Sequence, residues 1–182
     1  MLDLSLNVMD ISQNSISAGA TKLFVSVEEI NDKLTIIIED NGKGMSKEVL
    51  SKVDDPFYTT RTTRKVGLGL SLFKMQAQLT GGDFSISSKE HIGTKVKAIF
   101  FKDHVDMLPL GDMTETVWLL ITCNPKLDVI YNRGCNGKSF TLKTSEIKDE
   151  LGDDELIETP EVVAWIKEYL TEKTTDICRK DD

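Results

Sequence analysis

The chain has 182 residues, of which 40% are hydrophobic, and this is enough apolar material for a folded core. Its formal net charge is −8, and this diffuse acidic charge argues against nucleic acid as the main partner, because phosphate backbones need clustered Lys and Arg. No apolar run approaches the roughly 20 residues that span a bilayer, so no membrane segment is expected.

The first part of the chain predicts a helix followed by two strands. Residues 2–18 have helical spacing, with apolar side chains gathered on one side. Leu2, Leu6, Met9 and Ile16 form the predicted buried face, which Leu4, Val8 and Ile11 widen. Residues 22–29 and 34–40 are typical of strands, joined by a turn at 30–33. A glycine-containing loop at 40–44 then ends the second strand.

The next elements repeat this order. A short helix is expected at 46–53 and a mobile polar loop at 54–66. A second long helix at 68–80 precedes strands at 83–88 and 94–101. Because the strands come in adjacent pairs, the expected fold class is α+β, a two-layer α/β sandwich with helices on one face of a mostly antiparallel sheet.

The last part of the chain predicts a linker at 103–115 and a small β-rich and helical extension at 116–182, after a first domain at 1–102. Strand-like apolar runs lie at 116–123, 127–132 and 139–143. Residues 146–158 contain seven acidic residues and one lysine. A helix at 161–172 is expected to close the chain, with Thr159 as its cap and Pro160 at its first position.

Candidate chemistry begins on the first predicted helix. Asp10 and Asn14 lie four residues apart and therefore share one helix face. An amide oxygen can ligate Mg²⁺, which prefers hard oxygen ligands, and a carboxylate can orient or deprotonate a water that attacks phosphorus. Taken alone, the pair is explained more simply as a solvated polar stripe.

The second motif follows the second predicted strand. Asp40 ends that strand, where its carboxylate can accept a hydrogen bond from an exocyclic amine such as that of adenine. Gly42 and Gly44 let a ligand lie close to the backbone. Alone, the segment is equally well explained as a tight turn.

The third motif opens the second long helix with Gly67 and Gly69. The free N–H groups at a helix N-terminus, with the helix dipole, favour phosphate. Basic residues just before the helix would add charge to the same ligand, namely Arg61, Arg64 and Lys65. The alternative is a flexible surface loop followed by a core helix.

Together the three motifs resemble the GHKL family of ATPases and kinases, which includes gyrase B-like topoisomerases, heat-shock chaperones of that class, histidine kinases and MutL. The resemblance covers roughly residues 2–101. The segments QNSISAGATK and DNGKGM are most similar to MutL, whereas DPFYTTR, GLGLS and the later Gly93-Thr94 are more similar to a sensor histidine kinase. The family has the Bergerat fold, an α/β sandwich that agrees with the predicted order of elements.

The resemblance implies ATP and Mg²⁺ as ligands and a role for each matching residue. Asn14 would hold Mg²⁺ against the triphosphate, and Asp10 takes the place of the Glu that is the general base in the ATPase branch. Asp40 would bind the adenine amine with Thr94 nearby, and residues 57–66 would form the lid. The other residues implied to contact ATP are Gly42, Gly44, Met45, Phe57, Arg61, Lys65, Gly67, Leu68, Gly69 and Leu70.

Two departures from the family pattern favour binding over turnover. Asp10 is one methylene shorter than Glu, which would misplace the attacking water. Lys65 and Val66 stand where the second glycine motif usually has Gly and a small residue. The expected function is therefore that of a regulatory ATP-binding protein with slow hydrolysis, which signals to a protein partner of unknown identity.

Two other functions stay open: a serine/threonine protein kinase resembling the anti-sigma kinases, and a non-catalytic interaction module whose acidic stretch meets a basic partner. Autophosphorylation is not expected, because the chain begins at the ATP-site helix and His91 and His104 are predicted surface residues. The absence of a signal peptide and the odd cysteine count favour a reducing cytoplasm. Cys123 and Cys135 are expected to be buried small hydrophobes. The oligomeric state is not predicted.

Overall fold

The computed structural model describes residues 3–52 and 68–179. The helices are α1 (Leu4–Ser17), α2 (Lys47–Leu50), α3 (Leu68–Leu79), α4 (Met113–Thr122), α5 (Thr144–Leu151) and α6 (Pro160–Cys178), with a 3-10 helix at Asp154–Glu158. The strands are β1 (Lys22–Ile30), β2 (Lys33–Asp40), β3 (Asp83–Lys89), β4 (Gly93–Phe101), β5 (Asp128–Cys135) and β6 (Lys138–Lys143).

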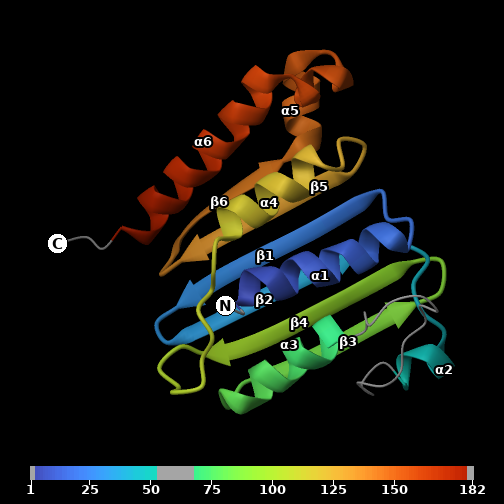
Figure 1. Cartoon of the computed structure of the whole chain (residues 1–182), viewed down its shortest axis with the longest axis vertical. Helices are drawn as coiled ribbons and strands as arrows, with labels where there is room; N and C mark the ends of the chain where they lie inside the picture. The colour runs from blue at the N-terminus through green and yellow to red at the C-terminus, as the bar shows by residue number, and fades with distance from the viewer. Residues whose placement is uncertain (1–2, 53–67, 180–182) are drawn as a thin grey trace.

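The described strands form a single mixed sheet in the order β3-β4-β2-β1-β5-β6 (Figure 1). Neighbouring strands are antiparallel, except that β1 and β5 run parallel. Helices α1, α3 and α4 lie across one face of this sheet (Figure 1). The predicted α+β sandwich is therefore confirmed, and β5 and β6 extend the same sheet.

Alternation along the strands explains which face the helices cover. In β2, Leu34, Ile36 and Ile38 are each at most 1% exposed, whereas the residues between them are only half-buried. A strand places alternate side chains on opposite faces, so these three point into the core. The same alternation continues to Asp40 and places its carboxylate on the helix-covered face, at the end of the sheet.

Helix α1 packs on the sheet through a narrower stripe than the sequence predicts. Leu4, Val8 and Ile11 are at most 3% exposed, at the spacing of one helix face. Leu6, predicted on the buried face, is 48% exposed. Two residues along a helix is more than half a turn, so Leu6 points away from the side that Leu4 presents to the sheet.

The predicted strand at 116–123 is wrong, because residues 116–122 belong to α4 and Cys123 is its C-cap. Asp112 caps the helix by accepting a hydrogen bond from the Glu115 N–H at 2.8 Å. The apolar run then buries Val117 and Leu120 at helical spacing. A short apolar run fits a buried helix as well as a strand, and the tertiary contacts select the helix. Cys123, expected to be buried, is exposed beyond its end.

The C-terminal part contains more helix than expected. Helix α6 is longer than the predicted 161–172, and α5 lies in the acidic segment where no helix was predicted. Thr159 is at the predicted cap position of α6, but its hydroxyl donates to the Leu156 carbonyl at 2.8 Å instead of capping the helix. Helix α6 is joined to α4 where the Trp118 indole N–H donates to the Val163 carbonyl at 2.9 Å.

Among residues 3–52 and 68–179, no helix has both the length and the apolar character needed to cross a membrane.

Candidate functional site

Asp40 is fixed at the end of β2 by hydrogen bonds to both carboxylate oxygens. The Ser15 hydroxyl of α1 donates to Oδ2 at 2.6 Å, and the Gly42 N–H donates to Oδ1 at 2.8 Å. Thr94 of β4 is the register partner of Asp40. An ionised carboxylate has about four acceptor sites, so Asp40 can accept a further hydrogen bond from a ligand in an orientation that is already set.

The loop after Asp40 packs closely on the turn between β3 and β4. Gly44 has φ 64°, and a Cβ built there would lie 2.0 Å from the Lys89 carbonyl oxygen. The Ser88 hydroxyl accepts from the Met45 N–H at 2.9 Å and pairs with the Thr94 hydroxyl at 2.8 Å. Ser88 was not singled out in the sequence, where it is an ordinary serine in a polar strand; its role is visible only once the loop and the strand are in contact.

Substituting Gly44 by Ala is expected to lower the free energy of unfolding by about 3 kcal/mol, because backbone strain of roughly 1–2 kcal/mol is added to a clash with the Lys89 carbonyl. Gly19→Ala is the matched control. Its φ is similar at 77°, but no atom lies within 4 Å of the added Cβ, so a loss of only about 1 kcal/mol is expected. Urea unfolding of both variants measures the difference. Equal losses would mean that the contact with Lys89 does not constrain this loop.

The second part of the site lies where α1 meets the first turn of α3. A Cβ built on Gly69 would lie 3.0 Å from the Asp10 Cβ and 3.4 Å from its Oδ2 atom, so a larger residue here would push Asp10 away by a few tenths of an ångström. Asn14 is one turn further along α1, and both Asp10 and Asn14 are exposed. The pair therefore faces solvent beside a helix N-terminus, whose free N–H groups favour anions.

Helix α1 connects the two parts of the site. Ser15, which holds Asp40, is the next residue after Asn14. The structure thus brings the predicted residues together in two adjoining groups: Asp40, Gly42, Gly44, Met45 and Thr94 in the first, and Asp10, Asn14 and Gly69 in the second. The donor set of the second group, a carboxylate and an amide oxygen, is of the kind that fits Mg²⁺.

Other predicted residues are placed differently. Leu70 is half-buried and packs against the hydrophobic core. Leu68 begins α3, and its backbone alone is described. The predicted lid at 57–66, with Phe57, Arg61 and Lys65, lies outside the described residues, as does Gly67.

Comparison with known proteins matches residues 2–104, more than half of the chain, to the family described as histidine kinase-, DNA gyrase B-, and HSP90-like ATPase. The chain belongs to this family, whose domains bind ATP, so the resemblance predicted from the three motifs is confirmed.

Individual relatives are sensor kinases and an ATPase domain. The chain is 30% identical over 86 residues to the sensor histidine kinase YvrG of Bacillus subtilis, covering 45% of this chain and 15% of that protein. It is 35% identical over 91 residues to sporulation kinase D of the same organism, covering 50% and 18%. The chain therefore spans less than a fifth of each kinase. The MutL ATPase domain of Aquifex aeolicus, complexed with ADP, gives a TM-score of 0.46 at 14% identity, covering 80% of this chain and 67% of that one.

Proposed function

We propose that the chain binds ATP together with Mg²⁺ and acts as a regulatory ATP-binding protein with slow hydrolysis. The observation that carries this proposal is the fixed carboxylate of Asp40, held by Ser15 and Gly42 at the end of α1 that also presents Asn14. Membership of the ATPase family supports the same ligand.

In this proposal each group of the site contacts a different part of ATP. The free lone pairs of Asp40 accept the adenine amine, beside Thr94 and against the backbone of Gly42. The N-terminus of α3 would bind the triphosphate, because backbone N–H groups and the helix dipole stabilise negative charge there. Asn14 would hold Mg²⁺ through its amide oxygen, and the ion would offset the phosphate charge.

Slow hydrolysis follows from the length of the carboxylate at position 10. Asp10 adjoins Gly69 at the start of α3, which is the place where the terminal phosphate would lie. An Asp carboxylate reaches one methylene less far than Glu, and a displacement of about 1 Å costs roughly a hundredfold in rate. Bound ATP would therefore be hydrolysed slowly.

Regulation would act through the C-terminal extension at 116–182 and the linker at 103–115, beyond an ATP-binding domain at 1–102. The Pro109 carbonyl of the linker accepts a hydrogen bond from the Leu4 N–H at 3.0 Å, and the Leu110 carbonyl accepts one from the Ser5 N–H at 2.9 Å. The linker therefore holds the start of α1, the ATP-site helix. All residues of β5 pair with β1. These contacts would couple the ATP-site helix to the extension, where a protein partner would sense bound nucleotide.

Lengthening Asp10 tests the proposed hydrolysis. Asp10→Glu is expected to raise the rate of phosphate release by up to about a hundredfold, which is the loss that the shorter side chain would cause. Asp10→Asn is expected to lower the rate about a hundredfold, because general bases typically contribute factors of that size or more. Gln13→Glu is the control, since it adds a carboxylate at an exposed position of the same helix. This variant should leave the rate of phosphate release unchanged. Phosphate release is measured with saturating ATP and Mg²⁺.

Unchanged release from Asp10→Asn would contradict the assignment of this carboxylate as the base. Transfer of the phosphate to a serine or threonine of a protein, in place of release to water, would identify the chain as a protein kinase instead.

A further inference from the structure

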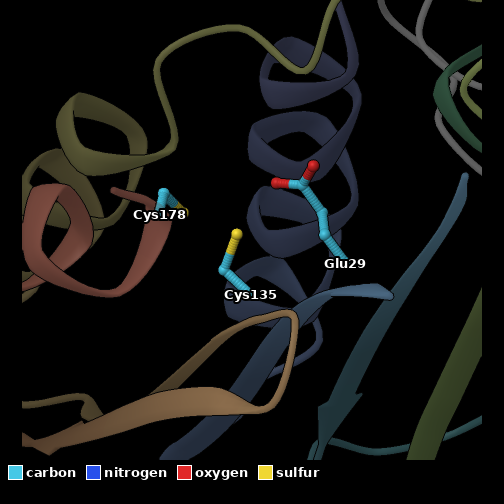
Figure 2. Close-up of side chains that lie close together, drawn as sticks. All are labelled: Glu29, Cys135 and Cys178. Atoms are coloured by element: carbon cyan, nitrogen blue, oxygen red, sulfur yellow. The ribbon is translucent and has the colours of Figure 1, made fainter. Parts of the chain in front are cut away.

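A cluster of two thiols and a carboxylate lies at the other end of the helix-covered face from Asp40. Glu29 and Cys135 are register partners on β1 and β5, and Cys178 ends α6. Their side chains converge on one space (Figure 2), and the two sulfurs and a carboxylate oxygen lie within 4.8 Å of one another. Three segments far apart in the sequence therefore meet at this point.

A guanidinium group contacts two of the three members of this cluster, Glu29 and Cys178. Arg133, only 4% exposed, donates to the Glu29 carboxylate and lies 3.5 Å from the Cys178 sulfur. It also donates to the Gly134 carbonyl at 2.7 Å. Lys102 donates to the other oxygen of Glu29 at 2.9 Å. Two cations thus neutralise the carboxylate, and a metal would have to displace a buried, hydrogen-bonded arginine. The remaining reactive pair is the two thiols.

Burial slows the ionisation of one of the two thiols. Burial, and a hydrogen bond to Cys135, raise the pKa of the Cys178 thiol to about 11. Thiol exchange requires a thiolate, so Cys178 reacts more slowly at neutral pH than an exposed thiol.

We propose that Cys135 and Cys178 are a redox-active pair that forms a reversible disulfide by exchange with a low-molecular-weight disulfide. The thiolate of one cysteine attacks one sulfur of the small disulfide, whose S–S bond breaks and releases one small thiolate. The other thiol then loses its proton to solvent and attacks the protein sulfur of this mixed disulfide, and the second small thiolate leaves. Both small thiolates take up protons, so two protein thiols are oxidised while the small disulfide is reduced to two thiols.

The disulfide would attach the end of α6 to the end of β5. It would close the segment that contains β6, α5 and α6, and restrict its opening. Nearby Arg133 would keep its contact with Glu29, so the neighbouring ion pairs need not rearrange. The redox state of the pair would then set how freely α6 separates from the sheet.

Incubation in glutathione buffers of increasing oxidised fraction tests the proposal on the full chain. In the wild type, we expect a peptide that links Cys135 to Cys178 on non-reducing maps, and a mass lower by two hydrogens that thiol reductants reverse. Hydrogen exchange in the last turns of α6 should slow by roughly tenfold on oxidation. Cys123→Ser, which removes an exposed cysteine outside the cluster, should behave as the wild type.

The single variants show whether the two sulfurs act as a pair. Cys178→Ser and Cys135→Ser should each stop at a mixed disulfide with glutathione on the cysteine that remains. Wild-type protein in which each thiol carries its own glutathione, or in which Cys123 joins the cross-link, would overturn the proposal. Protection of both thiols by equimolar Zn²⁺ would also overturn it, and would identify the cluster as a metal site. These readouts do not depend on ATP, so they leave the proposed function unaffected.

Discussion

Replacing Asp40 by Asn is expected to weaken ATP binding about a hundredfold, which corresponds to roughly 2–3 kcal/mol for a lost hydrogen bond to a charged acceptor. The Gly42 N–H requires an acceptor at the Oδ1 position, so the new amide nitrogen would take the Oδ2 position. There it would face the Ser15 hydroxyl, which can turn to accept. The adenine amine, also a donor, would then meet a donor.

Glu39→Gln is the matched control for this variant, because Glu39 is the adjacent carboxylate on the other face of β2. It is paired with Lys95 at 2.9 Å and is 48% exposed. The same change of charge there should alter ATP affinity little, as surface pairs contribute roughly 0–1 kcal/mol. Calorimetric titration with ATP measures the affinity of both variants. Equal affinity of Asp40→Asn and Glu39→Gln would mean that Asp40 does not contact the nucleotide.

Replacing Arg133 by Met is expected to lower the free energy of unfolding by about 3 kcal/mol, because removing one partner of a buried ion pair leaves the other charge uncompensated. The side chain of Arg133 is 4% exposed and that of Glu29 is 18% exposed. Lys102→Met is the control, since Lys102 is 31% exposed and its loss leaves Arg133 in place; about 1 kcal/mol is expected. Denaturant unfolding of Arg133→Met and Lys102→Met compares their free energies of unfolding.

The free energy of unfolding should depend on pH through the ion pair of Glu29 with Arg133. Burial raises the pKa of Glu29. The hydrogen bonds and positive charges of Lys102 and Arg133 together lower it by more, so the pKa lies below its ordinary value of 4.5. Its contribution to stability is therefore present above pH 4.5 and is lost as pH falls through the folded-state pKa. The stability gap between the wild type and Arg133→Met should narrow in acid. A gap that stays constant would show that Met disrupts packing and not charge pairing.

How much of the fold the sequence predicts depends on whether local pattern or tertiary contact decides each element. The strands from β1 to β4 follow from alternation and from β-branched runs such as 35–38, and the turn glycines bound them. Helix α4 was missed because the apolar run at 116–123 has no decisive period. The capping residue Asp112 was the available signal for a helix at this place.

The candidate site was predicted by motif, but its internal contacts were not. Asp40 and Gly44 were predicted from the second motif, and Thr94 from the resemblance. The bonds that orient them join Ser15 to Asp40 and Ser88 to Met45, which are 25 and 43 residues apart. Serines have many roles, and no local pattern distinguishes these two. The cysteine pair was missed because Cys135 and Cys178 lie 43 positions apart in the sequence, and only the folded sheet brings α6 back to β5.

Calorimetric titration of ATP into the wild-type chain, with Mg²⁺ and again with a chelator, shows directly whether the chain binds the nucleotide. We expect saturable binding to one site, weakened on removal of Mg²⁺, because Asn14 would hold the ion and the ion would offset the phosphate charge. Absence of binding in the presence of Mg²⁺ would contradict the account, and would favour a domain that keeps this fold as an interaction module.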